Sequence, residues 1–227
     1  FVLLMGVPQP RAEHLTPDLP GEFAVFPLEG AMLLPRGRLP LNIFEPRYLA
    51  MVEDSLAAGR MFGMIQPDAA RPAVPSGPAL FRVGCLGRLS QFSETEDGRF
   101  LITLTGVIRF EVAAELAPCR GYRRVRASFD RFLCDLRPEP PPIGVSREHL
   151  MQALRAYFLR RSLEANWEVV GRLPDDTLVV TLAMSCPFTA PEKQAILEAG
   201  AEPAQAAALL ALLQMGACDD SPSRNAS

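Results

Sequence analysis

The sequence has few of the residues that build metal and redox sites. Only 2 of its 227 residues are histidine, and no metal-ligand spacing surrounds His14 or His149. The 5 cysteines are odd in number and no two form C-x-x-C, which argues against a zinc site or a disulfide framework. We therefore expect no metal, no cofactor and no catalytic residue. We interpret the cysteines as free thiols of a cytoplasmic protein.

Long apolar runs and phosphate-binding motifs are also absent. The apolar start FVLLMGVPQP stops at Pro8 and lacks basic residues, so it is too short for a membrane span and wrongly flanked for a secretory signal. No G-x-x-x-x-G-K-[ST] occurs, which excludes the P-loop of ATPases. Lysine is scarce, since Lys193 is the only one among 23 basic residues, and the net charge of -3 gives little support to general nucleic-acid binding.

The first half of the chain has the pattern of a β-rich fold. Residues 67–79 are proline-rich and predict a loop. Asp97-Gly98 predicts a tight hairpin turn, because glycine reaches positive φ without steric cost. Glycines inside the long strands indicate bulges or bends, as in a curled sheet or barrel. The expected strands are Phe23–Phe26, Arg38–Phe44, Met61–Ile65, Phe81–Leu89, Phe100–Val112 and Tyr122–Phe132.

The second half has helical periodicity. We expect Ser146 to cap a first helix, Pro174–Met184 to form another, and Thr189 with Glu192 to form a capping box. A last helix is expected at Ala204–Leu213. The predicted organisation is an N-terminal extension (1–19), a β-rich subdomain (20–136), a proline-rich linker (137–145), a helical subdomain (146–216) and a disordered tail (217–227).

The junction LPLNIFEPRY, residues 39–48, changes abruptly from strand to helix. Pro46 suits the first helical position, where its missing N–H has no partner to lose. Glu45 places a negative charge at the helix N-terminus, and Gly59 suits the position that follows the helix. Phe44 and Ile43 predict a strand buried on both faces. Geometry therefore explains most of this stretch.

Several motifs in order carry a family resemblance. The most specific motif is Phe44-Glu-Pro-Arg-Tyr48. The other motifs are Val25-Phe-Pro-Leu28, Leu34-Pro35, Phe62-Gly-Met64, Val83-Gly84, Asp97-Gly-Arg99 and Thr105–Phe110. Over 23–115 the chain with these motifs resembles the N-terminal, substrate-binding domain of Lon proteases. The resemblance implies an α+β fold, with a PUA-like pseudo-barrel of curled sheets and one helix followed by a small helical bundle.

The resemblance also implies a role in recruiting substrate polypeptides and in assembly. The serine–lysine dyad of the protease is missing, because Lys193 lies at a helix start with no matching serine motif. We therefore expect a free-standing Lon N-terminal domain that is not an enzyme. It would act as an adaptor or chaperone-like factor in protein quality control. The expected partners are unfolded or client polypeptides, a Lon-type protease or a second copy, and no membrane.

Six residues are candidates for contact with a polypeptide: Phe44, Glu45, Arg47, Tyr48, Met51 and Arg109. For Glu45 and Arg47 the alternative is a structural ion pair that ties the helix to a neighbouring strand. For Phe44 and Tyr48 the alternative is burial in the core. Arg109 points away from its two apolar neighbours, so it either lies on a solvated face or pairs with an acid such as Glu45. A groove at this junction, or strand addition to an open sheet edge, would hold the polypeptide.

RNA binding is the alternative function, and we judge it weaker. The basic segment from Arg120 to Arg131 places Tyr122, Arg124 and Arg126 on one strand face, an aromatic residue interleaved with cations as in single-strand binders. A solvated strand edge would favour arginine as well.

Overall fold

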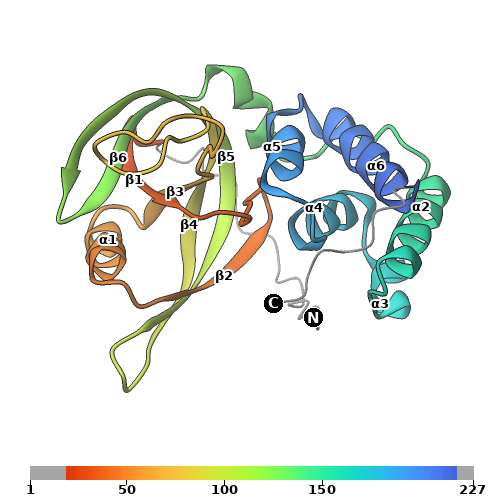
Figure 1. Cartoon of the computed structure of the whole chain (residues 1–227), viewed down its shortest axis with the longest axis horizontal. Helices are drawn as coiled ribbons and strands as arrows, with labels where there is room; N and C mark the ends of the chain where they lie inside the picture. Colours follow the sequence, from red (N-terminus) through yellow and green to blue (C-terminus); the bar gives the residue numbers. More distant parts are fainter. Residues whose placement is uncertain (1–18, 219–227) are drawn as a thin grey trace.

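The computed structural model describes residues 19–218. A β-rich half and a helical half lie side by side (Figure 1), which confirms the α+β prediction. The predicted extension and tail fall outside the described residues, apart from residues 19, 217 and 218. Within the described range no helix is both long and apolar enough to cross a membrane.

Six strands form one sheet in the order β2-β5-β4-β3-β1-β6. Strand β5 also pairs with β6, so the sheet closes into a pseudo-barrel with β2 outside the ring. All pairs are antiparallel except β1 with β3. The strands are β1 (Glu22–Pro27), β2 (Arg38–Ile43), β3 (Met61–Ile65), β4 (Val83–Glu94), β5 (Phe100–Cys119) and β6 (Tyr122–Ser128).

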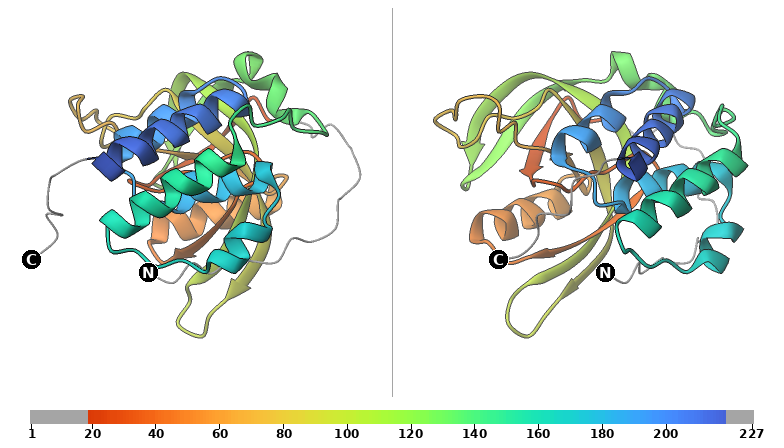
Figure 2. Two further views of the ribbon diagram at one scale, coloured as in Figure 1. Left: turned by 90° about the vertical axis from the view of Figure 1, so that its right-hand side faces the viewer. Right: turned by 45° about the vertical axis from the view of Figure 1, so that its right-hand side comes forward.

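Strands β4 and β5 are longer than their apolar alternation predicts. β4 continues past Leu89 with exposed polar residues that still pair with β5, and β5 continues to Cys119 because its end pairs with β6. The predicted turn joins them, with Gly98 at a φ of 76°. Figure 2 shows the β4–β5 hairpin projecting from the barrel in both views.

Strand β6 is shorter than predicted. It ends at Ser128, and a 3-10 helix, η1 (Asp130–Leu136), replaces the expected strand end. The turn carries Phe132, 1% exposed, into the core and brings Asp135 beneath β5.

One long helix packs on the barrel and five form the helical half. They are α1 (Pro46–Ala57), α2 (Arg147–Arg160), α3 (Trp167–Arg172), α4 (Asp175–Ser185), α5 (Ala190–Glu198) and α6 (Glu202–Cys218). The Thr189–Glu192 capping box and Pro46 in the first turn of α1 are confirmed. Ser146 occupies the N-cap of α2, but its side chain makes no capping hydrogen bond, so that part of the prediction is wrong. Helix α3 was not predicted, and α6 extends past residue 216.

Buried apolar side chains of both halves form one continuous core. The proline-rich linker takes part in it, because Ile143 is 5% exposed. Polar side chains also cross the boundary. The Lys193 ammonium donates to the Gly30 carbonyl at 2.7 Å, and the Gln194 amide donates to the Val83 carbonyl at 3.1 Å. Burial lowers the pKa of Lys193. The two halves are thus packed as one unit.

Candidate functional site

The Phe44–Tyr48 junction exposes only part of its motif. The Arg47 guanidinium lies 2.8 Å from the Glu45 carboxylate, and the two side chains are 50% and 45% exposed. Arg47 also lies 4.5 Å above the Tyr48 ring. Glu45 and Arg47 therefore pair with each other at the start of α1. The expectation that this ion pair ties the helix to a neighbouring strand is wrong.

The aromatic residues of the junction divide between core and solvent. Tyr48 is 7% exposed and packs on Phe26 with ring centroids 4.3 Å apart, and Met51 is fully buried. Phe44 is 61% exposed, which corrects the expectation that this strand end is buried on both faces. The chain leaves the sheet at Ile43, so Phe44 lies past the last β2–β5 pair. Of the apolar candidates, only Phe44 is available to a ligand.

Arg109 is a buried structural residue in this fold. Its side chain is 1% exposed, and its guanidinium binds both carboxylate oxygens of Asp135 at 2.9 and 2.7 Å. It also donates to the carbonyls that end α5, namely those of Leu197, Ala199 and Gly200. The acidic partner of Arg109 is thus Asp135, and not Glu45 as expected from the sequence. Arg109 thus links β5, η1 and α5, and its buried side chain is not available to a ligand.

The arginine side chains of the basic strand β6 are largely engaged in ion pairs. Arg124 and Arg126 both pair with Glu22, at 3.8 and 2.8 Å. Tyr122 is 6% exposed, and its hydroxyl donates to Asp54 at 2.7 Å. This hydrogen bond holds the pKa of Asp54 below its usual value, and burial raises the pKa of Tyr122. β6 pairs on both sides, so the expectation of a solvated edge is wrong.

Three strand segments form a flat surface that the sequence did not reveal. We call it the blade: β2 (38–43), the start of β5 (100–105) and the outer part of β4 (88–94). The paired residues align in rows, so that Leu101 lies between Asn42 and Ser93, and Thr105 lies between Arg38 and Arg88. An open groove of about 870 Å³ runs along it, lined by residues 40–42, 90–93 and 101–103.

Hydrogen bonds between side chains fix the outer face of the blade. The Thr103 hydroxyl donates to the Gln91 side-chain oxygen at 2.8 Å, and the Thr105 hydroxyl donates to the Ser90 hydroxyl at 2.9 Å. Ser90 is the extra residue of a bulge between Leu89 and Gln91. These bonds place Thr103, Thr105 and the polar residues of β4 on one face. Beside them, Leu101 is 46% exposed.

The blade also has open strand edges. β3 pairs with β4 only as far as Arg88, so residues 89–94 have no strand on that side among residues 19–218. β2 pairs with β5 and with no other strand in the described part of the chain. Unpaired main-chain groups on such edges accept an added strand.

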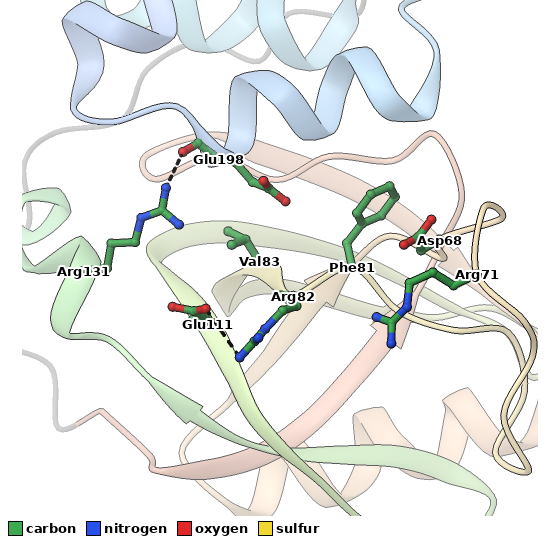
Figure 3. A pocket seen from close by; sticks show the side chains of 8 residues that line it. All are labelled: Asp68, Arg71, Phe81, Arg82, Val83, Glu111, Arg131 and Glu198. Carbon is green, nitrogen blue, oxygen red and sulfur yellow. Dashed lines mark hydrogen bonds and ion pairs between the residues drawn. The ribbon is translucent and has the colours of Figure 1, made fainter.

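A second hollow lies between the barrel and the helical half (Figure 3). It is a cleft of about 340 Å³ lined by Asp68, Arg71, Phe81, Arg82, Val83, Glu111, Arg131 and Glu198. Arg82 lies 3.6 Å from Glu111, and Arg131 donates to the Glu198 carbonyl at 3.0 Å. The lining has three arginines and three carboxylates, so the cleft has no excess charge of either sign.

The potential metal ligands of the described residues do not gather into a site. No three His, Cys, Asp or Glu side chains lie together as metal ligands within 19–218. The cysteines are free. Burial raises the pKa of Cys85 and raises that of Cys186 to about 12, so both stay as thiols at neutral pH.

Comparison with known proteins identifies the family. The model of the ATP-dependent protease La (LON) substrate-binding domain matches residues 22–215. The chain belongs to this family. The crystal structure of a Lon N-terminal domain protein from Xanthomonas campestris shares the fold, with a TM-score of 0.55, 24% identity, and 84% of this chain and 97% of that one covered. The N-terminal domain of a Mycobacterium avium complex Lon protease gives a TM-score of 0.53 at 17% identity, covering 88% of this chain and 100% of that one.

The full-length relatives are much longer than the matched region. Lon protease 2 of Myxococcus xanthus is 23% identical over 183 residues, which are 80% of this chain and 22% of that protein. Lon protease 2 of Sorangium cellulosum is 29% identical over 154 residues, 66% of this chain and 17% of that protein. This chain thus corresponds to the substrate-binding domain and not to the catalytic part of those proteases.

Proposed function

We propose that this Lon substrate-binding domain binds unfolded or client polypeptides on the blade. The observation that carries the proposal is the combination of exposed apolar side chains, Leu101 on the blade and Phe44 directly after β2, with the open strand edges of the blade. Main-chain hydrogen bonds to an edge need no particular sequence, and the apolar side chains favour unfolded segments. The family's name for the domain supports the same role.

The proposal extends to the protein's wider role. It acts without catalysis, as an adaptor or chaperone-like factor in protein quality control in the cytoplasm. A Lon-type protease or a second copy of the chain is its partner. The support for a non-catalytic role is that the matched part of the relatives is their substrate-binding domain.

The expected affinity is modest. Full burial of a Leu or Phe side chain contributes about 1.5–3 kcal/mol, and Leu101 and Phe44 are only 46% and 61% exposed to begin with. Together they supply about 2–3 kcal/mol, and a few edge hydrogen bonds add about 1 kcal/mol each. The cost of association and of ordering the polypeptide offsets most of this gain, so weak binding is expected.

RNA binding through Tyr122, Arg124 and Arg126 has less support. Arg124 and Arg126 already pair with Glu22, and the Tyr122 ring is buried and cannot stack on a base. A ligand there would have to break these ion pairs.

Fluorescence anisotropy tests the proposal. A labelled unfolded polypeptide and a labelled single-stranded RNA are titrated with the protein at 50 mM and 500 mM salt. We expect salt-tolerant binding of the polypeptide, weakened about thirtyfold or more by the double variant Phe44→Ser/Leu101→Ser, since these side chains supply about 2–3 kcal/mol. The matched control is Leu159→Ser, because Leu159 is 85% exposed but lies on α2. Steeply salt-dependent RNA binding without polypeptide binding, or an equal effect of both variants, would contradict the proposal.

A further inference from the structure

Two arginines occupy one row at the barrel end of the blade. Arg38 on β2 and Arg88 on β4 both pair with Thr105 of β5, one from each side. Both are exposed and lie on the same outer face as Leu101, because residues two and four apart on a strand share a face. Their Cβ atoms are roughly 10 Å apart, two strand spacings, so both guanidinium groups can reach one anion above Thr105.

Within the described residues Arg38 and Arg88 have no acidic partner, in contrast to the exposed arginines on and beside β6. Arg38 makes no side-chain hydrogen bond or ion pair within residues 19–218, and the only contact of Arg88 is to the sulfur of Met61 at 4.0 Å. On and beside β6, by comparison, Arg120, Arg124 and Arg126 each pair with a carboxylate. None of the five paired rows of the blade from Arg38 to Asn42 contains an acidic residue.

The outer face is therefore polarised along its length. The positive end lies at Thr105 and the apolar end at Leu101, four residues along β5 and roughly 13 Å away. An extended polypeptide that lies on this face, and is not paired along an edge, presents side chains i and i+4 toward the blade with the same spacing. We propose that Arg38 and Arg88 bind a carboxylate of the bound polypeptide, so that the blade selects segments with a large apolar residue four positions from an acidic group. This inference rests on the proposed function.

Paired peptides test the selection. Labelled peptides of a Ser/Thr/Gly host sequence contain Leu at one position and either Glu or Gln four positions further on. A third peptide ends at that position with a free carboxylate, and a fourth ends there with an amide. We expect the Glu peptide to bind about fivefold more tightly than the Gln peptide at low salt, the effect of about 1 kcal/mol from two exposed ion pairs. Tighter binding of the peptide with the free C-terminal carboxylate than of the Glu peptide would identify chain termini as the preferred source of the carboxylate.

The variant Arg38→Gln/Arg88→Gln is expected to bind the Glu and Gln peptides equally, at the affinity of the wild type for the Gln peptide. Arg71→Gln is the matched control, because Arg71 is exposed, has no ion pair with any other described residue and lies in the 67–79 loop, and it should keep the fivefold preference. Equal binding of the two peptides by the wild type, or a preference that survives in the double variant, would overturn this inference alone. If no peptide binds, the proposed function fails and the inference fails with it.

Discussion

Replacing Arg109 with methionine tests how the two halves are held together. Methionine keeps most of the apolar volume but leaves the Asp135 carboxylate, 7% exposed, without its counter-ion. The carbonyls of Leu197 and Gly200, which now accept from Arg109 at 3.1 and 2.8 Å, also lose their donor. Breaking a buried pair in this way costs about 3–5 kcal/mol, a third or more of the stability of an ordinary domain.

Urea denaturation measures the loss. Far-UV circular dichroism follows both halves, and the single tryptophan, Trp167, reports on the helical half. Because Arg109 joins β5 to the end of α5, we expect both signals to shift to lower urea together. The matched control is Arg99→Met, which breaks an exposed pair with Asp97 and should cost less than about 1 kcal/mol.

A double-mutant cycle separates the coupling energy between Arg109 and Asp135 from the other contributions of the two side chains. Arg109→Met/Asp135→Leu should lose at least about 1 kcal/mol less than the sum of the single variants, because the second change removes the stranded charge. Strict additivity, or a loss below about 1 kcal/mol for Arg109→Met, would refute the assignment of this pair as the link between the halves.

Three further predictions concern stability. Tyr122→Phe removes the hydrogen bond that lowers the pKa of Asp54. This bond stabilises the fold above the unfolded pKa of about 4, and its contribution is lost as pH falls through the lower folded pKa, so we expect the variant to lose about 1 kcal/mol at pH 7 and less below about pH 4. A difference in urea midpoint between variant and wild type that is equal at pH 7 and below about pH 4 would contradict it. Gly106→Ala places a Cβ in steric conflict with the Leu34 carbonyl oxygen and should cost about 2–3 kcal/mol, measured by thermal unfolding, whereas an unchanged midpoint would show that the backbone yields there. Thr189→Ala removes the capping box of α5 and should cost about 1 kcal/mol by urea denaturation; a neutral effect would mean that packing alone holds the helix start.

Local signals in the sequence predicted much of the fold. Asp97-Gly98 marked the hairpin turn, Thr189 with Glu192 marked the start of α5, and Pro46 marked the start of α1. Each depends on residues within a few positions, so a single sequence contains the information. The polar ends of β4 and β5 were missed because their pairing, and not their composition, makes them strands.

The candidate site depended more on contacts between distant residues. Arg109 could be recognised as an unusual charge on a strand, but its partner lies 26 residues away in a 3-10 helix that no periodicity indicated. Phe44 was a candidate from its motif, although its exposure became evident only from the end of β2. The Arg38–Arg88 row required the register of three strands, which a sequence pattern does not contain.

The measurement that tests the central claim most directly is hydrogen–deuterium exchange of the protein with and without a saturating unfolded polypeptide. The account predicts slower exchange of backbone amides in β2 and in residues 89–103, where strand edges are open and the groove lies. Protection confined to β6, to the cleft between the halves or to the helical half would contradict the assignment of the blade as the binding surface.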